Sequence, residues 1–189
     1  MSSTIKGPDG KPRCRWCAAA PEFFDYRLFE KLCLESFQLG LSWRTILAKR
    51  ENFRAAFYDF DFDRVARFSQ RDVNRLLKDE GIVRHRGKIE AVINNAKRAQ
   101  ELIKTEGSLA AYLWRYEPDK KNLANPQTVS TSAESIALSK DLKKRGWKFV
   151  GPTTAYAFMQ AMGLINDHVE GCVSRAKVER ERKKFKRPG

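Results

Sequence analysis

Hydrophobic residues recur at helical spacing along most of the chain. Between Tyr26 and Phe57 they fall three or four positions apart, and Gly40 interrupts the pattern. Such spacing places one side of a helix against a core, so it predicts two helices that meet in a corner between Phe37 and Trp43. The residues that define the pattern are Leu28, Phe29, Leu32, Trp43, Ile46 and Leu47.

Capping signals predict two further helices in the middle of the chain. Ser69 followed by Asp72 resembles a capping box, in which the two side chains bond to each other's backbone amides. Gly81 can end this helix in the left-handed conformation. A second helix follows at once and runs to about Gly107.

The last third of the chain continues the helical pattern. Thr131 with Glu134 is another cap signature, which predicts a helix that stops near Gly146. Residues 154–162 predict one more helix, and only residues 147–150 favour an extended piece.

These elements predict one all-α domain, because neither an internal repeat nor an inter-domain linker separates them. The domain covers residues 13–174, between a mobile arm at 1–12 and a basic tail at 175–189. No apolar run is long enough to span a bilayer, and the first residues lack the apolar stretch of a secretory signal. We therefore expect a cytoplasmic protein.

The charge of the chain indicates a polyanionic partner. The formal net charge is +14. The tail contributes +6 of this, from eight Lys or Arg and two Glu, and the rest of the chain keeps +8. A basic tail alone is explained equally well as a solubility feature, but charge spread over the body favours DNA or RNA.

A basic turn lies between the two helices in the middle of the chain. The segment from Leu77 to Lys88 is typical of a helix-hairpin-helix DNA clamp. In such a clamp, backbone amides and the N-terminus of the second helix face a phosphate. Arg84, Arg86 and Lys88 would add positive charge there. An ordinary helical corner with solvated charges is the alternative.

The four cysteines do not indicate a disulfide framework in a chain without a secretory signal. Cys33 lies in an apolar run, where a free cysteine behaves as a small core residue. His168 and Cys172 are four residues apart, a spacing that brings both side chains to one side of a helical turn. With Cys14 and Cys17 near the other end, they could hold a zinc ion that joins the two ends.

Four segments together resemble the bacterial 3-methyladenine DNA glycosylase I family. They are LESFQLGLSW (34–43), GIVRHRGKI (81–89), LKKRGWKFVG (142–151) and NDHV (166–169). The resemblance implies an all-α helix-hairpin-helix protein with a structural zinc, acting as a monomer on duplex DNA. It also implies a base-excision repair enzyme that flips out 3-methyladenine and hydrolyses its N-glycosidic bond, leaving an abasic site, without lyase activity.

The same resemblance implies that Glu35 and Trp43 line the base pocket, with Glu35 as the catalytic candidate. A base alkylated at N3 carries a positive charge that weakens its own glycosidic bond, so the enzyme mainly has to recognise and extrude it. The face of Trp43 would attract this cation by about 0.5–2 kcal/mol, and the Glu35 carboxylate would accept from the amino edge of adenine. Phe23 and Tyr26 are further aromatic candidates for contacting the base.

The resemblance also implies which residues meet DNA at the lesion and which hold the metal. Gly40 and Leu41 would press into the gap that the flipped nucleotide leaves. Cys14, His168 and Cys172 would ligate zinc.

One segment of the family pattern is absent. The family carries a His-Asp-x-Glu-Trp-Gly segment where this sequence passes directly from Tyr26 to Arg27, and with it go one zinc ligand and an aromatic pocket wall. We expect a mobile loop at this point rather than a deletion. If the deletion is real, Cys17 is the nearest substitute ligand and catalytic competence is open to question.

Two other classes of protein fit the charge and the basic turn. One is a non-catalytic helix-hairpin-helix DNA-binding protein with a vestigial pocket. The other is a helical RNA-binding protein that uses the basic tail.

Overall fold

The computed structural model describes residues 5–6, 12–13, 24–119, 121, 123–169 and 172–186. Apart from one antiparallel pair of short strands, β1 (Ile5–Lys6) and β2 (Pro12–Arg13), the regular structure of these residues is helical. The all-α class predicted from the sequence is therefore confirmed. Within the same residues, no helix is both long and apolar enough to cross a membrane.

The helices follow one another with short connections over most of the chain. They are α1 (Phe24–Gln38), α2 (Trp43–Ala48), α3 (Arg50–Ala56), the 3-10 helix η2 (Tyr58–Phe60), α4 (Phe62–Val65), α5 (Gln70–Lys78), α6 (Arg86–Glu106), α7 (Leu109–Trp114), α8 (Ala133–Lys144), α9 (Pro152–Ala161) and α10 (Val173–Lys184).

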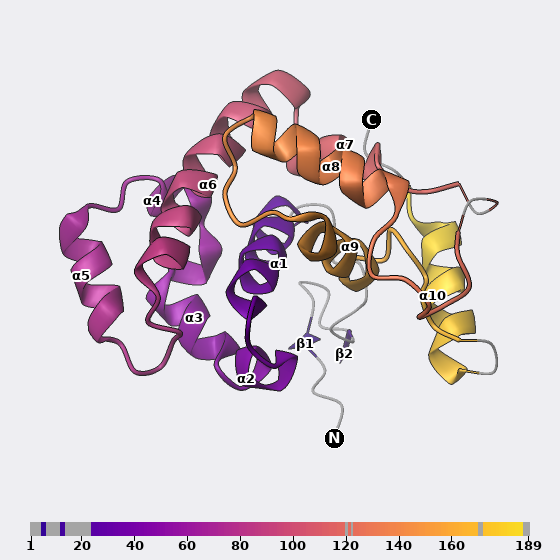
Figure 1. Ribbon diagram of the computed structural model, residues 1–189, viewed down its shortest axis with the longest axis horizontal. Helices are drawn as coiled ribbons and strands as arrows, with labels where there is room; N and C mark the ends of the chain where they lie inside the picture. The colour runs from indigo at the N-terminus through magenta and orange to yellow at the C-terminus, as the bar shows by residue number, and fades with distance from the viewer. Residues whose placement is uncertain are drawn as a thin grey trace.

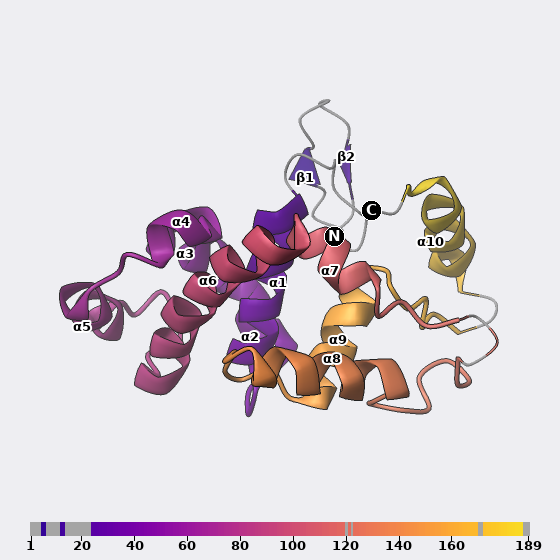
Figure 2. The same cartoon turned by 90° about the horizontal axis from the view of Figure 1, so that it is seen from above.

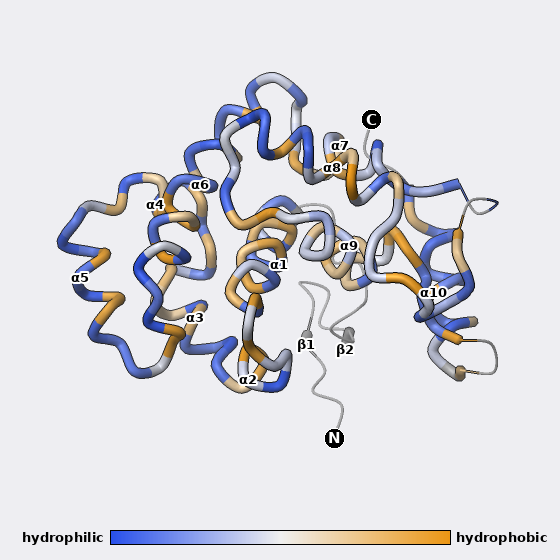
Figure 3. The backbone as a smooth tube through the Cα atoms, in the orientation of Figure 1, coloured by the Kyte–Doolittle hydropathy of each residue, from blue (hydrophilic) through white to orange (hydrophobic). Residues whose placement is uncertain are grey.

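Helix α1 occupies the centre of the molecule. It packs against α6 and η2 on one side and against α7 and α9 on the other, and α8 lies along α9 (Figures 1 and 2). In Figure 3 hydrophobic stretches gather along α1, whereas α5 at the far end is mostly hydrophilic. A cluster of buried aromatic rings joins α1 to α3 and η2, formed by Phe29, Phe37, Phe53, Phe57 and Phe60. The two predicted helices of the 26–57 region are thus α1 and the α2–α3 pair.

The signals in the middle of the chain are confirmed except at Gly81. Ser69 and Asp72 form the expected capping box at the start of α5, and Gly107 ends α6 with φ +84°. Helix α5, however, already ends at Lys78, and the φ of Gly81 is not positive. Glycine is needed at position 81 for space, because an added Cβ would lie 2.9 Å from an oxygen of Asp79.

The later elements differ from the prediction in small ways. The cap of α8 is Ser132 with Ser135, one residue after the predicted pair. Residues 147–150 form no strand, and Phe149 among them has φ +56°. Most of the segment predicted as a basic tail is helix α10, whose Arg182 forms a 2.6 Å ion pair with Glu117 of the main body.

Candidate functional site

A cleft of about 480 Å³ opens between α1, α2, α9 and α10. Helix α1 contributes Glu35 and Gln38, and Trp43 lies at the first position of α2. Asp167 and His168, from the segment after α9, line the opposite part of the cleft. The structure therefore brings together Glu35 and Trp43, as expected for a pocket.

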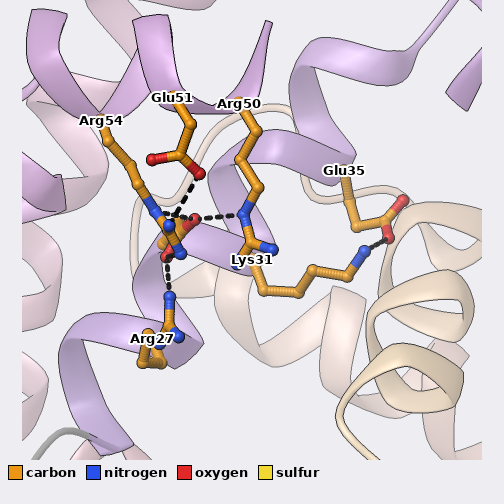
Figure 4. Close-up of polar contacts among 7 residues, drawn as sticks. Arg27, Lys31, Glu35, Arg50, Glu51 and Arg54 are labelled. Atoms are coloured by element: carbon orange, nitrogen blue, oxygen red, sulfur yellow. Dashed lines mark hydrogen bonds and ion pairs between the residues drawn. The ribbon is translucent and has the colours of Figure 1, made fainter. Parts of the chain in front are cut away.

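Lys31 contacts both Glu35 and Trp43. Its Nζ lies 2.5 Å from Glu35 Oε1 and 3.6 Å from the centroid of the Trp43 ring. Figure 4 shows the Lys31 side chain running along α1 to meet one oxygen of Glu35 while the other oxygen points away. Burial lowers the pKa of Lys31, and the Glu35 carboxylate opposes this shift. Sequence reasoning did not find this cation.

A second ion cluster fixes α1 against α3. The carboxylate of Glu30, which is 2% exposed, accepts hydrogen bonds from Arg50 Nε at 2.8 Å, Arg54 Nε at 2.9 Å and Arg27 Nη1 at 3.1 Å (Figure 4). Burial alone would raise the pKa of Glu30, but the ion pairs with Arg50 and Arg54 outweigh it and lower the pKa. The cluster was missed as well, although two arginines four residues apart would share one side of a helix.

The corner between α1 and α2, residues 39–42, presents hydrophobic side chains to solvent. Leu39 and Leu41 are 43% and 41% exposed, and Gly40 turns the chain with φ +81°. Ser42 then caps α2, its side chain accepting from the Thr45 amide at 3.2 Å. Gly40 and Leu41 thus lie at an exposed apolar tip directly before Trp43.

The turn between α5 and α6, residues 79–85, is held to α2 and α3 by side chains. Lys49 Nζ donates to the carbonyl of Glu80 at 2.7 Å, and Asn52 donates to the carbonyl of Gly81 at 3.2 Å. Arg84 remains half exposed and lies 3.7 Å from a carboxylate oxygen of Glu80. It can therefore reach an external anion.

Two basic residues begin α6 beside this turn, and they differ in accessibility. Arg86 is half exposed and lies 3.4 Å from Glu90. Lys88, by contrast, is 7% exposed, and its Nζ donates to the carbonyls of Phe37 at 2.9 Å and Leu39 at 2.5 Å. The expectation that Lys88 contacts a phosphate is wrong for this geometry, because its ammonium is directed into the protein.

Tyr26, an aromatic candidate near the start of α1, does not line the cleft. Tyr26 stacks on Phe62 with ring centroids 4.6 Å apart, and its hydroxyl donates to Asp63 at 3.3 Å. It precedes Glu35 by nine residues, which is roughly 14 Å along a helix. The expectation that Tyr26 contacts the base is therefore wrong. Phe23 lies outside the described residues.

The metal candidates are described only in part, since Cys14 and Cys17 lie outside the described residues. Among those that are described, no three His, Cys, Asp or Glu side chains gather to hold a metal. Cys172 Sγ and His168 Nδ1 are 3.7 Å apart. Two ligands of one tetrahedral zinc are about 3.5 Å apart, so this pair fits half of a site. Cys172 is the N-cap of α10 and not part of the helical turn expected with His168.

Fold and site together define a helical protein with an acidic and aromatic cleft beside an exposed apolar corner. The sequence matches the methyladenine glycosylase family over residues 15–176, and the chain belongs to that family. It is 44% identical to DNA-3-methyladenine glycosylase 1 of Escherichia coli K12 over 177 residues, covering 85% of this chain and 95% of that protein.

Solved structures agree with this assignment. One is a structure of 3-methyladenine DNA glycosylase I from Staphylococcus aureus that describes the basis of 3-methyladenine recognition. It superposes with a TM-score of 0.77 at 37% identity, covering 84% of this chain and 87% of that one. A variant of 3-methyladenine DNA glycosylase I in complex with 3-methyladenine gives 0.76 at 37% identity, covering 84% and 88%.

The comparison also bears on the absent segment. The alignment with the E. coli protein runs over 177 positions but covers 85% of these 189 residues, about 161, so about 16 positions have no residue here. Tyr26 and Arg27 are consecutive residues within the unbroken helix α1. The expectation of an additional mobile loop between them is therefore wrong, because the chain is continuous at this point.

Proposed function

We propose that this protein removes 3-methyladenine from alkylated duplex DNA by hydrolysing the N-glycosidic bond, leaving an abasic site. The observation that carries the proposal is the placement of Glu35 and Trp43 in one cleft directly behind the exposed corner. The family to which the chain belongs supports the same activity.

The cleft offers the two interactions that a flipped cationic base needs. The indole of Trp43 provides a face for stacking and for cation–π attraction, worth about 0.5–2 kcal/mol. The second oxygen of Glu35, which points away from Lys31 in Figure 4, can accept a hydrogen bond from the amino group of the base. Because the positive charge of the base already weakens the bond to the sugar, binding the extruded base supplies much of the selectivity.

The protein would attack the sugar with water rather than with an amine. The two lysines beside the site are committed to partners: Lys31 to Glu35 and Trp43, and Lys88 to two backbone carbonyls. A lyase reaction needs an amine that can form a Schiff base. The geometry therefore favours a monofunctional hydrolase.

Binding to DNA would combine an apolar wedge with phosphate contacts. Leu41 at the corner is suited to fill the gap left by an extruded nucleotide, because apolar side chains such as leucine can insert between bases. Arg84, Arg86 and the backbone amides at the start of α6 would grip a phosphate, as in a helix-hairpin-helix clamp. These contacts need only one copy of the chain. They fit a monomer that acts on DNA in the cytoplasm.

A structural zinc is the proposed cofactor, held by Cys14, His168 and Cys172, with Cys17 as the candidate fourth ligand. The 3.7 Å separation of His168 and Cys172 supports this assignment. Bound there, zinc would crosslink the start of the chain to the base of α10. In that place it would be structural and would supply no chemistry to the reaction.

The metal proposal predicts about one zinc per chain and a lower melting temperature after chelation, because metal-binding energy contributes to folding energy. Elemental analysis of protein purified without chelator measures the first, and a thermal melt with and without chelator measures the second. Cys172→Ala should lose the metal. Cys33→Ala is the matched control and should keep it, since Cys33 is buried in the core. Zinc-free wild-type protein would refute the proposal.

A second candidate function is a non-catalytic DNA-binding protein. Two observations favour it: the sequence lacks the His-Asp-x-Glu-Trp-Gly segment that would supply an aromatic wall, and a cation already pairs with Glu35. Such a protein would bind duplex through the corner and the turn but release no base.

One experiment separates the two functions. Wild-type protein and Glu35→Gln are incubated in excess with a duplex that contains a single 3-methyladenine, and the released base is quantified over time. Release by wild type that exceeds release by the variant supports the glycosylase. Background release that is equal for wild type and variant, with retained duplex binding, supports the second function. Preference for RNA over duplex DNA in a competition assay would contradict both functions.

A further inference from the structure

Lys88 connects two parts of the protein that are distant in sequence. It is the third residue of α6, directly after the turn, and its Nζ reaches the carbonyls of Phe37 and Leu39. Phe37 belongs to the last turn of α1, and Leu39 is the first residue of the corner. One buried side chain therefore ties the turn to the backbone that carries Leu41.

The location of the acceptors explains why an ammonium is suited to this place. The last carbonyls of a helix have no partner within the helix, and the C-terminal end carries partial negative charge. A lysine amine can serve two such carbonyls at once. Desolvation lowers the pKa of Lys88, which is the expected result of holding a cation away from water.

The corner has few other restraints among the described residues. A Cβ added at Gly40 would meet nothing within 4 Å, so the tip is open on that side. The Leu41 amide donates to the Gln38 carbonyl at 2.7 Å, a bond that stays within the corner. Lys49 ties the other end of the turn to α2 through the Glu80 carbonyl. Lys88 thus ties the start of α6 to the corner, while Lys49 ties the other end of the turn to α2.

From this we infer that Lys88 is a positioning residue, which sets the corner with Leu41 at a fixed place relative to the DNA strand gripped by the turn. The inference rests on the proposed function. When the turn binds a phosphate, the distance from that phosphate to the wedge and to Trp43 is determined by this link. Lys88 itself contacts neither the phosphate nor the base.

The role predicts a separation between binding and base extrusion. In Lys88→Met the stem of the side chain is kept while the two hydrogen bonds are lost, so the corner is released but the charge facing DNA is unchanged. Excision from duplex should fall by about 10- to 100-fold, since a displacement of 1 Å can cost that much. The salt dependence of binding to undamaged duplex should not change, because no phosphate contact is lost.

The test measures three quantities for wild type, Lys88→Met and the matched control Lys97→Met, which changes an exposed lysine of the same helix. They are single-turnover excision, the salt dependence of plain duplex binding, and fluorescence of a 2-aminopurine placed opposite the lesion. Lys88→Met should lose excision and the extrusion signal, and Lys97→Met should keep both. Lys88→Met should excise a lesion in an unpaired bulge at the wild-type rate, because a base in a bulge is extruded without the help of Leu41.

Different failures of this test have different meanings. A reduced salt dependence in Lys88→Met would overturn the inference and make Lys88 a phosphate contact. Equal loss on duplex and bulge, with an early melt, would also overturn it and leave only a structural role. If wild type releases no base, the proposed function fails, but the extrusion signal and the salt dependence still decide whether Lys88 positions the corner.

Discussion

Lys31 and Lys88 are both largely buried, but they are held by different kinds of acceptor. Lys31 contacts a carboxylate and an aromatic ring, and both belong to the cleft. Lys88 contacts two main-chain carbonyls at the end of α1. Removal of Lys31 therefore changes the charge of the site, whereas removal of Lys88 changes the position of the backbone beside it.

This difference shows how α1 serves recognition and DNA contact separately. Its side chains at positions 31 and 35 form the charged surface of the cleft, and its last carbonyls anchor the corner. The Glu30 cluster holds the helix against α3 from a third side. Because α1 is the central helix of the fold (Figure 1), a shift of this helix would affect the cleft and the corner together.

The largest expected effect is on stability, in Lys31→Met. The change leaves Glu35, whose side chain is 5% exposed, as a buried carboxylate without its counter-ion. Breaking one partner of a buried ion pair costs about 3 kcal/mol or more, so the free energy of unfolding in urea at pH 7 should fall by about that amount. Lys88→Met, which leaves neutral carbonyls unpaired, should cost only about 1–3 kcal/mol.

The double variant Lys31→Met with Glu35→Gln sharpens this comparison. It removes both charges, so it should recover a large part of the stability that Lys31→Met loses. Unfolding free energies of the two single variants and the double variant measure the coupling. Additive losses would mean that the two side chains do not form the ion pair in solution.

Much of the fold could be predicted because its signals are local. The capping box of Ser69 and Asp72 and the left-handed Gly107 depend on residues within one helical turn, so the sequence alone specifies them. The prediction for Gly81 failed because α5 already ends at Lys78, and the glycine is needed instead for space beside Asp79 and beside Asn52, a residue that is distant in sequence.

The site was predicted less completely, because burial and pairing depend on tertiary contacts. A family pattern places Glu35 and Trp43 together, yet it says nothing of Lys31 between them. Tyr26 was predicted as an aromatic candidate for contacting the base, whereas in the continuous α1 it stacks on Phe62. For Lys88 a signal was available: it precedes Val92 by four residues, so it lies on the buried side of α6.

A second, smaller expected effect is on excision, in Glu35→Gln. The amide keeps the shape of the side chain but removes the negative charge that would meet a cationic base. Single-turnover release of 3-methyladenine should fall on the order of 100-fold, similar to the loss of one preorganised electrostatic contact in other enzymes. Affinity for undamaged duplex should barely change, since it comes from phosphate contacts elsewhere.

Combining Glu35→Gln with Lys31→Met makes the result for Glu35 decisive, because Glu35→Gln also removes the carboxylate that pairs with Lys31. If Glu35 recognises the base, the double variant with Lys31→Met stays as slow as Glu35→Gln. Recovery of excision in the double variant would contradict that role and would leave Glu35 only as the counter-ion of Lys31. A thermal melt of each variant shows whether the measured protein is folded.

The smallest expected effect is on DNA affinity, in Arg84→Ala. Arg84 is half exposed and lies 3.7 Å from a carboxylate oxygen of Glu80, so it is available to a phosphate where Lys88 is not. Loss of one phosphate contact makes the slope of log affinity against log salt less negative by about 0.9. It should weaken binding to damaged and undamaged duplex alike. Fluorescence anisotropy over a series of salt concentrations measures both, with Lys97→Ala as a control for general charge. A loss of affinity confined to damaged duplex would place Arg84 at the lesion instead of at the DNA backbone. An unchanged slope would leave the start of α6, with its amides and Arg86, as the phosphate contact of the turn.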